Sequence, residues 1–288
     1  MRHAISLLSL LGLLGLGTPA IAQLKVFGCE PEWSALAGEL GGKHVEVFSA
    51  TTGRQDPHRI EARPSLIAKL RRADLLVCSG ADLEVGWLPL LLRQSANKKV
   101  QRGRPGYFEA AAVVERLDVP EKVDRILGDV HPAGNPHVHL DPRRMAQIAA
   151  ALAARLQVVD PANAAHYARR HSDFAARWQS SITRWEQLAA PLRGERIVTH
   201  HRDWIYLFDW LGITAAGTLE PKPGLPPGAG HLAKLKAQLA AEPARMVVHA
   251  AHQSPRSSLW LSEQTGMPAV TLPYTVGGNE QATNLFSL

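Results

Sequence analysis

Short apolar segments typical of β-strands alternate along this chain with segments of helical periodicity, and this alternation constrains the fold more than any other feature. The first half contains the strand-like segments LKVFG (24–28), HVEVFS (44–49) and DLLVC (74–78), with helix-like segments between and after them. The same alternation returns from RIVTH (196–200) to PAVTLP (268–273). Strands that alternate with helices form βαβ units with parallel strands. We therefore expect an α/β protein with two halves, each built on a parallel sheet.

A different segment separates the two halves. Residues 142–188 are rich in Ala, Arg, Gln and Leu, and the main break in their helical pattern is VVDPAN (158–163). Asp160 there is a candidate helix cap with Pro161 at the first helical position, which predicts one long helix over 161–189. We expect this helix to join the halves rigidly. The expected divisions are an amino-terminal lobe (23–141), a linking helical region (142–190) and a carboxy-terminal lobe (191–288).

The amino terminus has the pattern of a secretory signal peptide. Arg2 precedes an apolar run, and the small residues of AIA end at Ala22, so residues 1–22 are the expected signal. The apolar run is too short to span a bilayer, and no later segment is longer and equally apolar. A lipoprotein anchor at Cys29 is disfavoured because Lys25 separates that cysteine from the apolar run. We expect a soluble, periplasmic mature protein.

Charge and cysteine content narrow the chemistry further. The formal net charge of +6 comes from scattered basic pairs, which indicates a solvated surface and no nucleic-acid partner. The chain has two cysteines, Cys29 and Cys78, and each ends a short apolar run. If those runs are neighbouring parallel strands, the sulfurs meet and form a disulfide in an oxidising compartment; otherwise they are two small core residues. Thiolate metal chemistry is not expected in either case.

Histidines follow the predicted strands and lie in loops rich in Pro and Gly. His58 lies in the loop after the second predicted strand, His137 lies just before a predicted helix, and His200 ends the segment RIVTH with His201 directly after it. Ligands of open α/β sheets bind beyond the carboxyl ends of the strands. His58 and His201 therefore occupy the expected edge of their own halves, and a cleft between the two halves would bring them together. Taken singly, each is better explained as a turn residue or a helix cap, and only their joint placement favours a metal site.

Three neutral imidazoles suit Zn²⁺, whereas Mn²⁺ sites prefer more carboxylate oxygen. We expect Zn²⁺ as the ligand, with Mn²⁺ or another divalent metal less favoured. Copper and nickel also bind three histidines, because the order of metal affinities alone does not select zinc. His131 and His139 lie in the same segment as His137 (GDVHPAGNPHVHLDP, 128–142), and His249 and His252 follow a later strand in VVHAAHQ (247–253). These histidines are open candidates.

Several motifs together resemble one known family. They are QDPHRIEARPS (55–65), GNPHVHLDP (134–142), VTHHRDWIYLFDWLG (198–212) and LPYTVGG (272–278), and they span nearly the whole mature chain. The chain resembles the zinc and manganese solute-binding proteins of ABC importers, the cluster A-I or cluster 9 family. The resemblance implies two Rossmann-like lobes joined by a long backbone helix, with metal held in the interlobe cleft.

The resemblance also implies a ligand set. His58, His137 and His201 match the imidazole ligands of the family, whereas His200 matches a position usually filled by an aromatic or aliphatic residue. Many relatives supply an Asp near the final strand as fourth ligand, where this chain has Thr275 and Val276. The nearest carboxylate is Glu280, on a flexible Gly-Gly loop, and we expect it or a water molecule as fourth ligand. Further alternatives are His252, His139 and His131.

The expected function is high-affinity capture of Zn²⁺ and its delivery to the membrane permease of an ABC metal importer. A periplasmic metallochaperone is a further candidate partner, and we expect a monomer. A periplasmic zinc chaperone or an adhesin of the same fold is the alternative. A zinc hydrolase is less favoured, because the sequence has no HExxH pair and no Glu placed beside a ligand as a general base.

Overall fold

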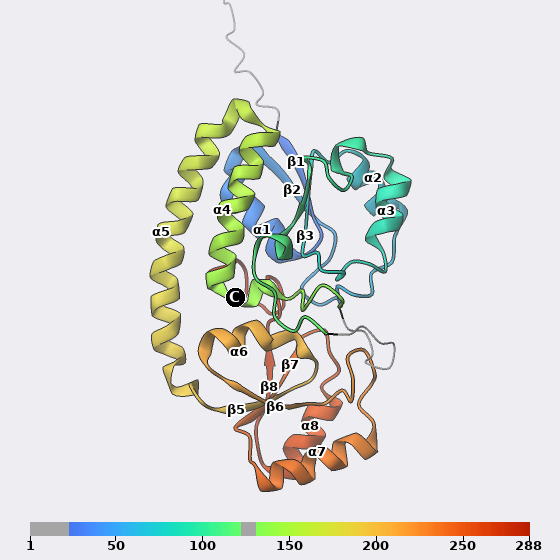
Figure 1. Ribbon diagram of the computed structural model, residues 1–288, viewed down its shortest axis with the longest axis vertical. Helices are drawn as coiled ribbons and strands as arrows, with labels where there is room; N and C mark the ends of the chain where they lie inside the picture. Colours follow the sequence, from blue (N-terminus) through green and yellow to red (C-terminus); the bar gives the residue numbers. More distant parts are fainter. Residues whose placement is uncertain (1–22, 122–130) are drawn as a thin grey trace, which may run out of the picture.

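Two four-stranded parallel sheets form the centres of the two lobes (Figure 1). The computed structural model describes residues 23–121 and 131–288, so the expected signal peptide lies outside the described residues. The first sheet contains β1 (Leu24–Gly28), β2 (Val45–Ser49), β3 (Leu75–Cys78) and β4 (Tyr107–Glu109). The second contains β5 (Arg196–Thr199), β6 (Thr214–Thr218), β7 (Met246–Ala250) and β8 (Ala269–Leu272). The predicted strands are confirmed, whereas β4 was missed because three residues are too short to show a period.

The two sheets share one topology. Their strand orders are β2-β1-β3-β4 and β6-β5-β7-β8, and every pairing is parallel. In each sheet the chain moves outward on one side of the first strand and then continues on its other side. Ligands of such sheets bind beyond the carboxyl ends of the strands at this switch point. The carboxyl ends of β1 and β5 therefore mark where a site is expected.

Helices surround the sheets and connect the lobes (Figure 1). Those of the first lobe are α1 (Pro31–Gly41), α2 (Pro64–Arg71) and α3 (Leu88–Ser95). The linking helices are α4 (Pro142–Val159) and α5 (Ala164–Ala189), and those of the second lobe are α6 (Ile205–Leu211), α7 (Ala229–Ala241) and α8 (Arg256–Thr265). Proline begins α1, α2 and α4, where its fixed φ is already helical and its missing N–H costs nothing. No helix within the described residues is long and apolar enough to cross a membrane.

The long linking helix is confirmed, with a change at its start. Residues Pro161–Asn163 form a turn of 3₁₀-helix, and α5 begins at Ala164. Asp160 caps no backbone N–H there; its carboxylate accepts a hydrogen bond from the hydroxyl of Tyr167 at 2.6 Å instead. Figure 1 shows α5 running beside α4 from the first lobe to the second. Its buried side chains, among them Phe174 and Trp178, fix it against the core.

The carboxy-terminal segment crosses from the second lobe back to the first. The hydroxyl of Thr275 donates a hydrogen bond to Glu32 of α1, and Phe286 packs against Trp178 of α5 with ring centres 5.1 Å apart. Gly53 lies so close to Gly277 that a Cβ at position 53 would be 2.4 Å from the Gly277 carbonyl carbon, so only glycine fits. The lobes are therefore tied together both by α5 and by this segment.

The expected disulfide is confirmed. Cys29 follows β1 and Cys78 ends β3, and these strands are paired neighbours in the sheet. The two cysteines are bonded, with Cα atoms 4.8 Å apart, and both side chains are buried. The bridge therefore joins the carboxyl ends of β1 and β3.

Candidate metal centre

His58 lies in the loop between β2 and α2 and is held by its neighbour Asp56. The Asp56 carboxylate accepts hydrogen bonds from the backbone N–H of His58 at 3.0 Å and from Nδ1 of its ring at 2.8 Å. The turn needs an Asx residue at this position because its side chain mimics a backbone acceptor. Because Nδ1 donates to Asp56, Nε2 carries the lone pair that a metal requires.

His137 lies in the loop before α4 and is buried. The side chain of Asn135 accepts a hydrogen bond from its backbone N–H at 3.0 Å, which sets the direction of the side chain. Its Nδ1 lies 2.5 Å from the hydroxyl of Tyr274, a residue of the second lobe that follows β8. Burial raises the pKa of Tyr274 well above its usual range, so this phenol is neutral. The contact again leaves Nε2 of His137 facing away from its partner.

His201 follows β5 at the carboxyl edge of the second sheet. Its Nδ1 lies 2.7 Å from a carboxylate oxygen of Glu220, which lies just beyond the end of β6. Each of the three imidazoles is therefore held at Nδ1 by a different residue. Asp56 and Glu220 lie in the same lobe as the histidine that they contact, whereas Tyr274 contacts His137 from the second lobe. The partners of metal-bound histidines hold the rings in this manner.

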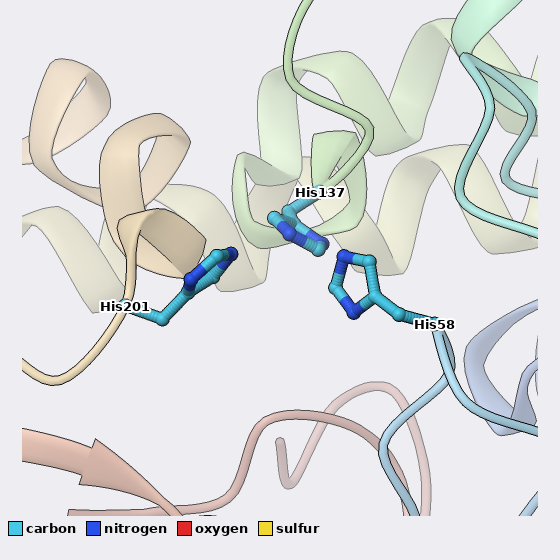
Figure 2. A group of neighbouring side chains, drawn as sticks. All are labelled: His58, His137 and His201. Atoms are coloured by element: carbon cyan, nitrogen blue, oxygen red, sulfur yellow. The ribbon is translucent and has the colours of Figure 1, made fainter. Parts of the chain in front are cut away.

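The three rings converge on one point from three loops (Figure 2). One nitrogen from each of His58, His137 and His201 lies within 4.8 Å of the other two. The Nε2 atoms of His58 and His137 are buried and have no hydrogen-bond partner in the protein. Buried polar atoms without a partner are rare, and here they face one another. This arrangement has the donor set and the convergence of a divalent metal site.

Carboxylates occupy two distinct places around the histidines. Asp56 and Glu220 contact the outer nitrogens, as described above. Asp203 lies on the inner side, since its Oδ1 is 3.7 Å from Nε2 of His137 and 3.7 Å from Nε2 of His201. Asp203 is buried, and its Oδ2 accepts a hydrogen bond from Gln253 at 2.7 Å. The inner side of the site therefore carries negative charge.

The histidines differ in their affinity for protons. Burial lowers the pKa of His137 well below its usual range, and the neighbouring His58 adds to this effect. Burial opposes a charge on His201 as well, but Asp203 and the hydrogen bond with Glu220 outweigh it and raise the pKa to about 9. At neutral pH one imidazole is therefore neutral and ready for metal, whereas another must first lose a proton.

A cavity of about 520 Å³ opens beside the three histidines. It lies between the lobes, and its lining includes His58, His201 and Asp203 as well as His200 and His252. A metal ion thus has a route to the inner nitrogens from solvent.

The other histidines predicted as alternative ligands lie at varying distances. The ring centre of His131 lies 5.4 Å from that of His58, and burial lowers the pKa of His131 to about 4. His139 turns away, because its Nε2 donates to the backbone carbonyl of Tyr274 at 3.0 Å and its Nδ1 faces Glu32 at 3.3 Å. His249 hydrogen-bonds Ser258 and Thr271 through its two ring nitrogens.

Glu280, the expected fourth ligand, is exposed in the carboxy-terminal segment and is not among the residues that line the cavity. Sequence reasoning did not identify Asp203 or Tyr274. The signal for Asp203 was its place two residues after His201. Tyr274 had no local signal, because its contact with His137 joins residues 137 positions apart.

The fold and the site define a class: a two-lobed α/β protein that holds a divalent metal between its lobes. The family model for ZnuA, the periplasmic zinc-uptake complex component A, matches residues 26–287, so this chain belongs to that family. The family is described as a periplasmic component of a zinc-uptake complex, and curated relatives are named as components of metal uptake systems, one of them an ABC transporter.

Individual relatives are distant and include proteins named for different metals. The chain is 25% identical over 185 residues to the high-affinity zinc uptake system protein ZnuA of Bacillus subtilis, covering 63% of this chain and 56% of that protein. It is 26% identical over 205 residues to the manganese ABC transporter substrate-binding lipoprotein PsaA of Streptococcus pneumoniae, covering 67% and 61%. The matched regions thus span less than two thirds of these relatives.

Solved structures share the fold. A crystal structure of ZnuA superposes with a TM-score of 0.77 at 22% identity, covering 92% of this chain and 95% of that one. A manganese-bound periplasmic metal-binding protein from Candidatus Liberibacter asiaticus superposes with a TM-score of 0.73 at 14% identity, covering 92% and 95%. At these identities the likeness concerns the fold alone.

Proposed function

We propose that this protein captures Zn²⁺ in the periplasm and delivers it to the membrane permease of an ABC metal importer. One observation carries the proposal: His58, His137 and His201 converge from both sides of the interlobe cleft, each with Nδ1 held by a partner. These three histidines are the proposed ligands. The signal peptide expected over residues 1–22 accounts for export, and a periplasmic metallochaperone remains a candidate donor of zinc.

The donor set supports zinc as the cargo. Imidazole nitrogen suits Zn²⁺, whereas Mn²⁺ favours sites rich in carboxylate oxygen. The relatives are named for zinc and for manganese, so their names do not choose between the two metals. Manganese is the alternative cargo that the experiment must test.

A binding role is favoured over hydrolysis. The carboxylates nearest the outer nitrogens, Asp56 and Glu220, are engaged by His58 and His201 and are not free to accept a proton from water. A zinc chaperone or adhesin of the same fold would bind the metal in the same way without restoring import. Transport therefore separates these functions, and metal binding alone does not.

Alanine variants of the three histidines test the proposal. His58→Ala, His137→Ala and His201→Ala should each weaken Zn²⁺ binding sharply in competition with a chromogenic chelator, because each removes one of three nitrogens. His171→Ala, on α5, is the matched control and should bind like the parent protein. Affinity for Mn²⁺, measured in the same way, should be much lower than for Zn²⁺.

The transport step is tested in a bacterium that lacks the solute-binding protein of its own zinc importer. Expression of this chain with its cognate permease should restore growth under zinc limitation, and the three histidine variants should fail to do so. Parental zinc affinity in all three variants would exclude the proposed site. Full binding without restored growth would favour the chaperone or adhesin.

A further inference from the structure

The three histidines leave one coordination position open, and the structure offers a donor for it. Zinc is usually bound by four ligands in a tetrahedron, at 2.0–2.1 Å for nitrogen and about 2.0–2.2 Å for carboxylate oxygen. Donor atoms in such a shell are about 3.4 Å apart. Oδ1 of Asp203 lies 3.7 Å from Nε2 of both His137 and His201. The histidine nitrogens lie within 4.8 Å of one another, so the atoms would have to move closer around an ion to reach ligand distance.

Asp203 faces the Nε2 atoms of the histidines, whereas the other carboxylates at the site contact Nδ1. Asp56 and Glu220 contact Nδ1 of their histidines, on the side away from the centre. Asp203 faces the inner Nε2 atoms, where the ion would lie. Its other oxygen accepts a hydrogen bond from Gln253, so the carboxylate is already oriented with Oδ1 toward the histidines.

The electrostatics of the site favour a cation at this point. Asp203 is 2% exposed, and a buried carboxylate is costly unless a positive charge lies beside it. A divalent ion between Asp203 and the imidazoles would supply that positive charge and leave the carboxylate paired.

We infer that Asp203 is the fourth ligand of the metal, completing a shell of three imidazoles and one carboxylate. This inference rests on the proposed function, because it assumes the three-histidine site. The carboxylate ligand then comes from the turn after β5, two residues beyond His201. The sequence had instead suggested Glu280, which lies in an exposed loop. The second lobe then supplies two ligands from one turn, and His58 and His137 supply the others.

The first test compares conservative variants of the candidate fourth ligands. Asp203→Asn keeps the shape of the side chain and its bond with Gln253 but removes the charge. Loss of the hydrogen-bond partner of a metal ligand weakens binding about 10- to 100-fold, and Asp203→Asn, which removes a ligand itself, should weaken Zn²⁺ binding by more than that. Asp209→Asn, on α6 and paired with Arg143, is the matched control and should bind like the parent. Glu280→Gln and His131→Ala should also retain parental affinity.

The second test asks whether position 203 touches the metal, which a purely structural role would not require. The full chain carrying Asp203→Cys is loaded with Co²⁺. A thiolate that coordinates the ion should produce a sulfur-to-cobalt charge-transfer band in the near ultraviolet, which the parent lacks. Asp203→Asn should in turn alter the visible d–d spectrum of bound Co²⁺, and Asp209→Asn should leave it unchanged.

The outcomes separate this inference from the proposed function. If Asp203→Asn binds zinc like the parent and Asp203→Cys shows no charge-transfer band, while His58→Ala loses zinc, the fourth-ligand assignment is wrong and the three-histidine site stands. A loss confined to Glu280→Gln or His131→Ala would assign the position to that residue and overturn the inference. If His58→Ala also binds like the parent, the proposed site itself fails.

Discussion

Replacing Tyr274 with Phe isolates the contribution of one hydroxyl to the metal site. This hydroxyl lies 2.5 Å from Nδ1 of His137, and both side chains are buried. When Nε2 of His137 binds a metal, Nδ1 carries the proton and donates it to the phenol oxygen. The variant removes this acceptor and leaves a buried N–H without a partner.

The magnitude follows from that loss. An unsatisfied buried polar group costs about 1–3 kcal/mol. Loss of the outer partner of a metal-bound histidine typically lowers metal affinity about 10- to 100-fold, which corresponds to about 1.4–2.7 kcal/mol. The two ranges agree, so we expect Tyr274→Phe to weaken zinc binding by 10- to 100-fold while the fold is retained.

Chelator competition at fixed pH measures the affinity, and Tyr167→Phe is the matched control. Tyr167 is equally buried, but its hydroxyl donates to Asp160 at the corner between α4 and α5. That variant should lose stability without losing zinc affinity. Equal zinc affinities for the parent and Tyr274→Phe would refute the reasoning, because the hydroxyl would then contribute nothing to the ligand it contacts.

Two further predictions concern stability and pH. The Cys29–Cys78 bridge spans a sequence separation of 49. The double variant Cys29→Ser/Cys78→Ser should therefore have a free energy of unfolding, measured in urea, about 4 kcal/mol lower than that of the oxidised parent. An unchanged free energy of unfolding would contradict the predicted effect of the bridge. Because Asp203 and Glu220, acting against burial, raise the pKa of His201 to about 9, zinc must displace a proton from His201 at neutral pH. Zinc affinity should therefore rise with pH up to about 9, and calorimetry in buffers of different ionisation enthalpy should detect the released proton; affinity independent of pH between 7 and 9 would contradict this assignment.

The sequence by itself determined the elements and their order. Strand and helix periods are local properties, so the alternation of 24–28, 44–49 and 74–78 with helices was enough to predict parallel sheets. The long helix was also predictable from the sequence, because its helical periodicity continues without a break to Ala189. The sequence placed the two cysteines at strand ends, but the disulfide also required those strands to be neighbours, which the structure shows.

Only the tertiary structure decided the inner geometry of the site. Histidine positions in the chain show that His58, His137 and His201 lie at strand or helix ends, but not which ring nitrogen faces the centre. That choice depends on partners such as Tyr274, which comes from the other lobe, and no local pattern encodes a contact between residues 137 positions apart.

Local sequence patterns also do not identify which carboxylate faces the histidines. Sequence spacing offered Glu280, with a water molecule as the alternative, because Glu280 is the acidic residue nearest the expected position in the chain, and its side chain is exposed. Asp203 was overlooked, although the turn after β5 directs it toward Nε2 of both His137 and His201. The packing of two lobes against each other sets the distance between such groups, and that distance is a property of the folded chain rather than of its local periodicity.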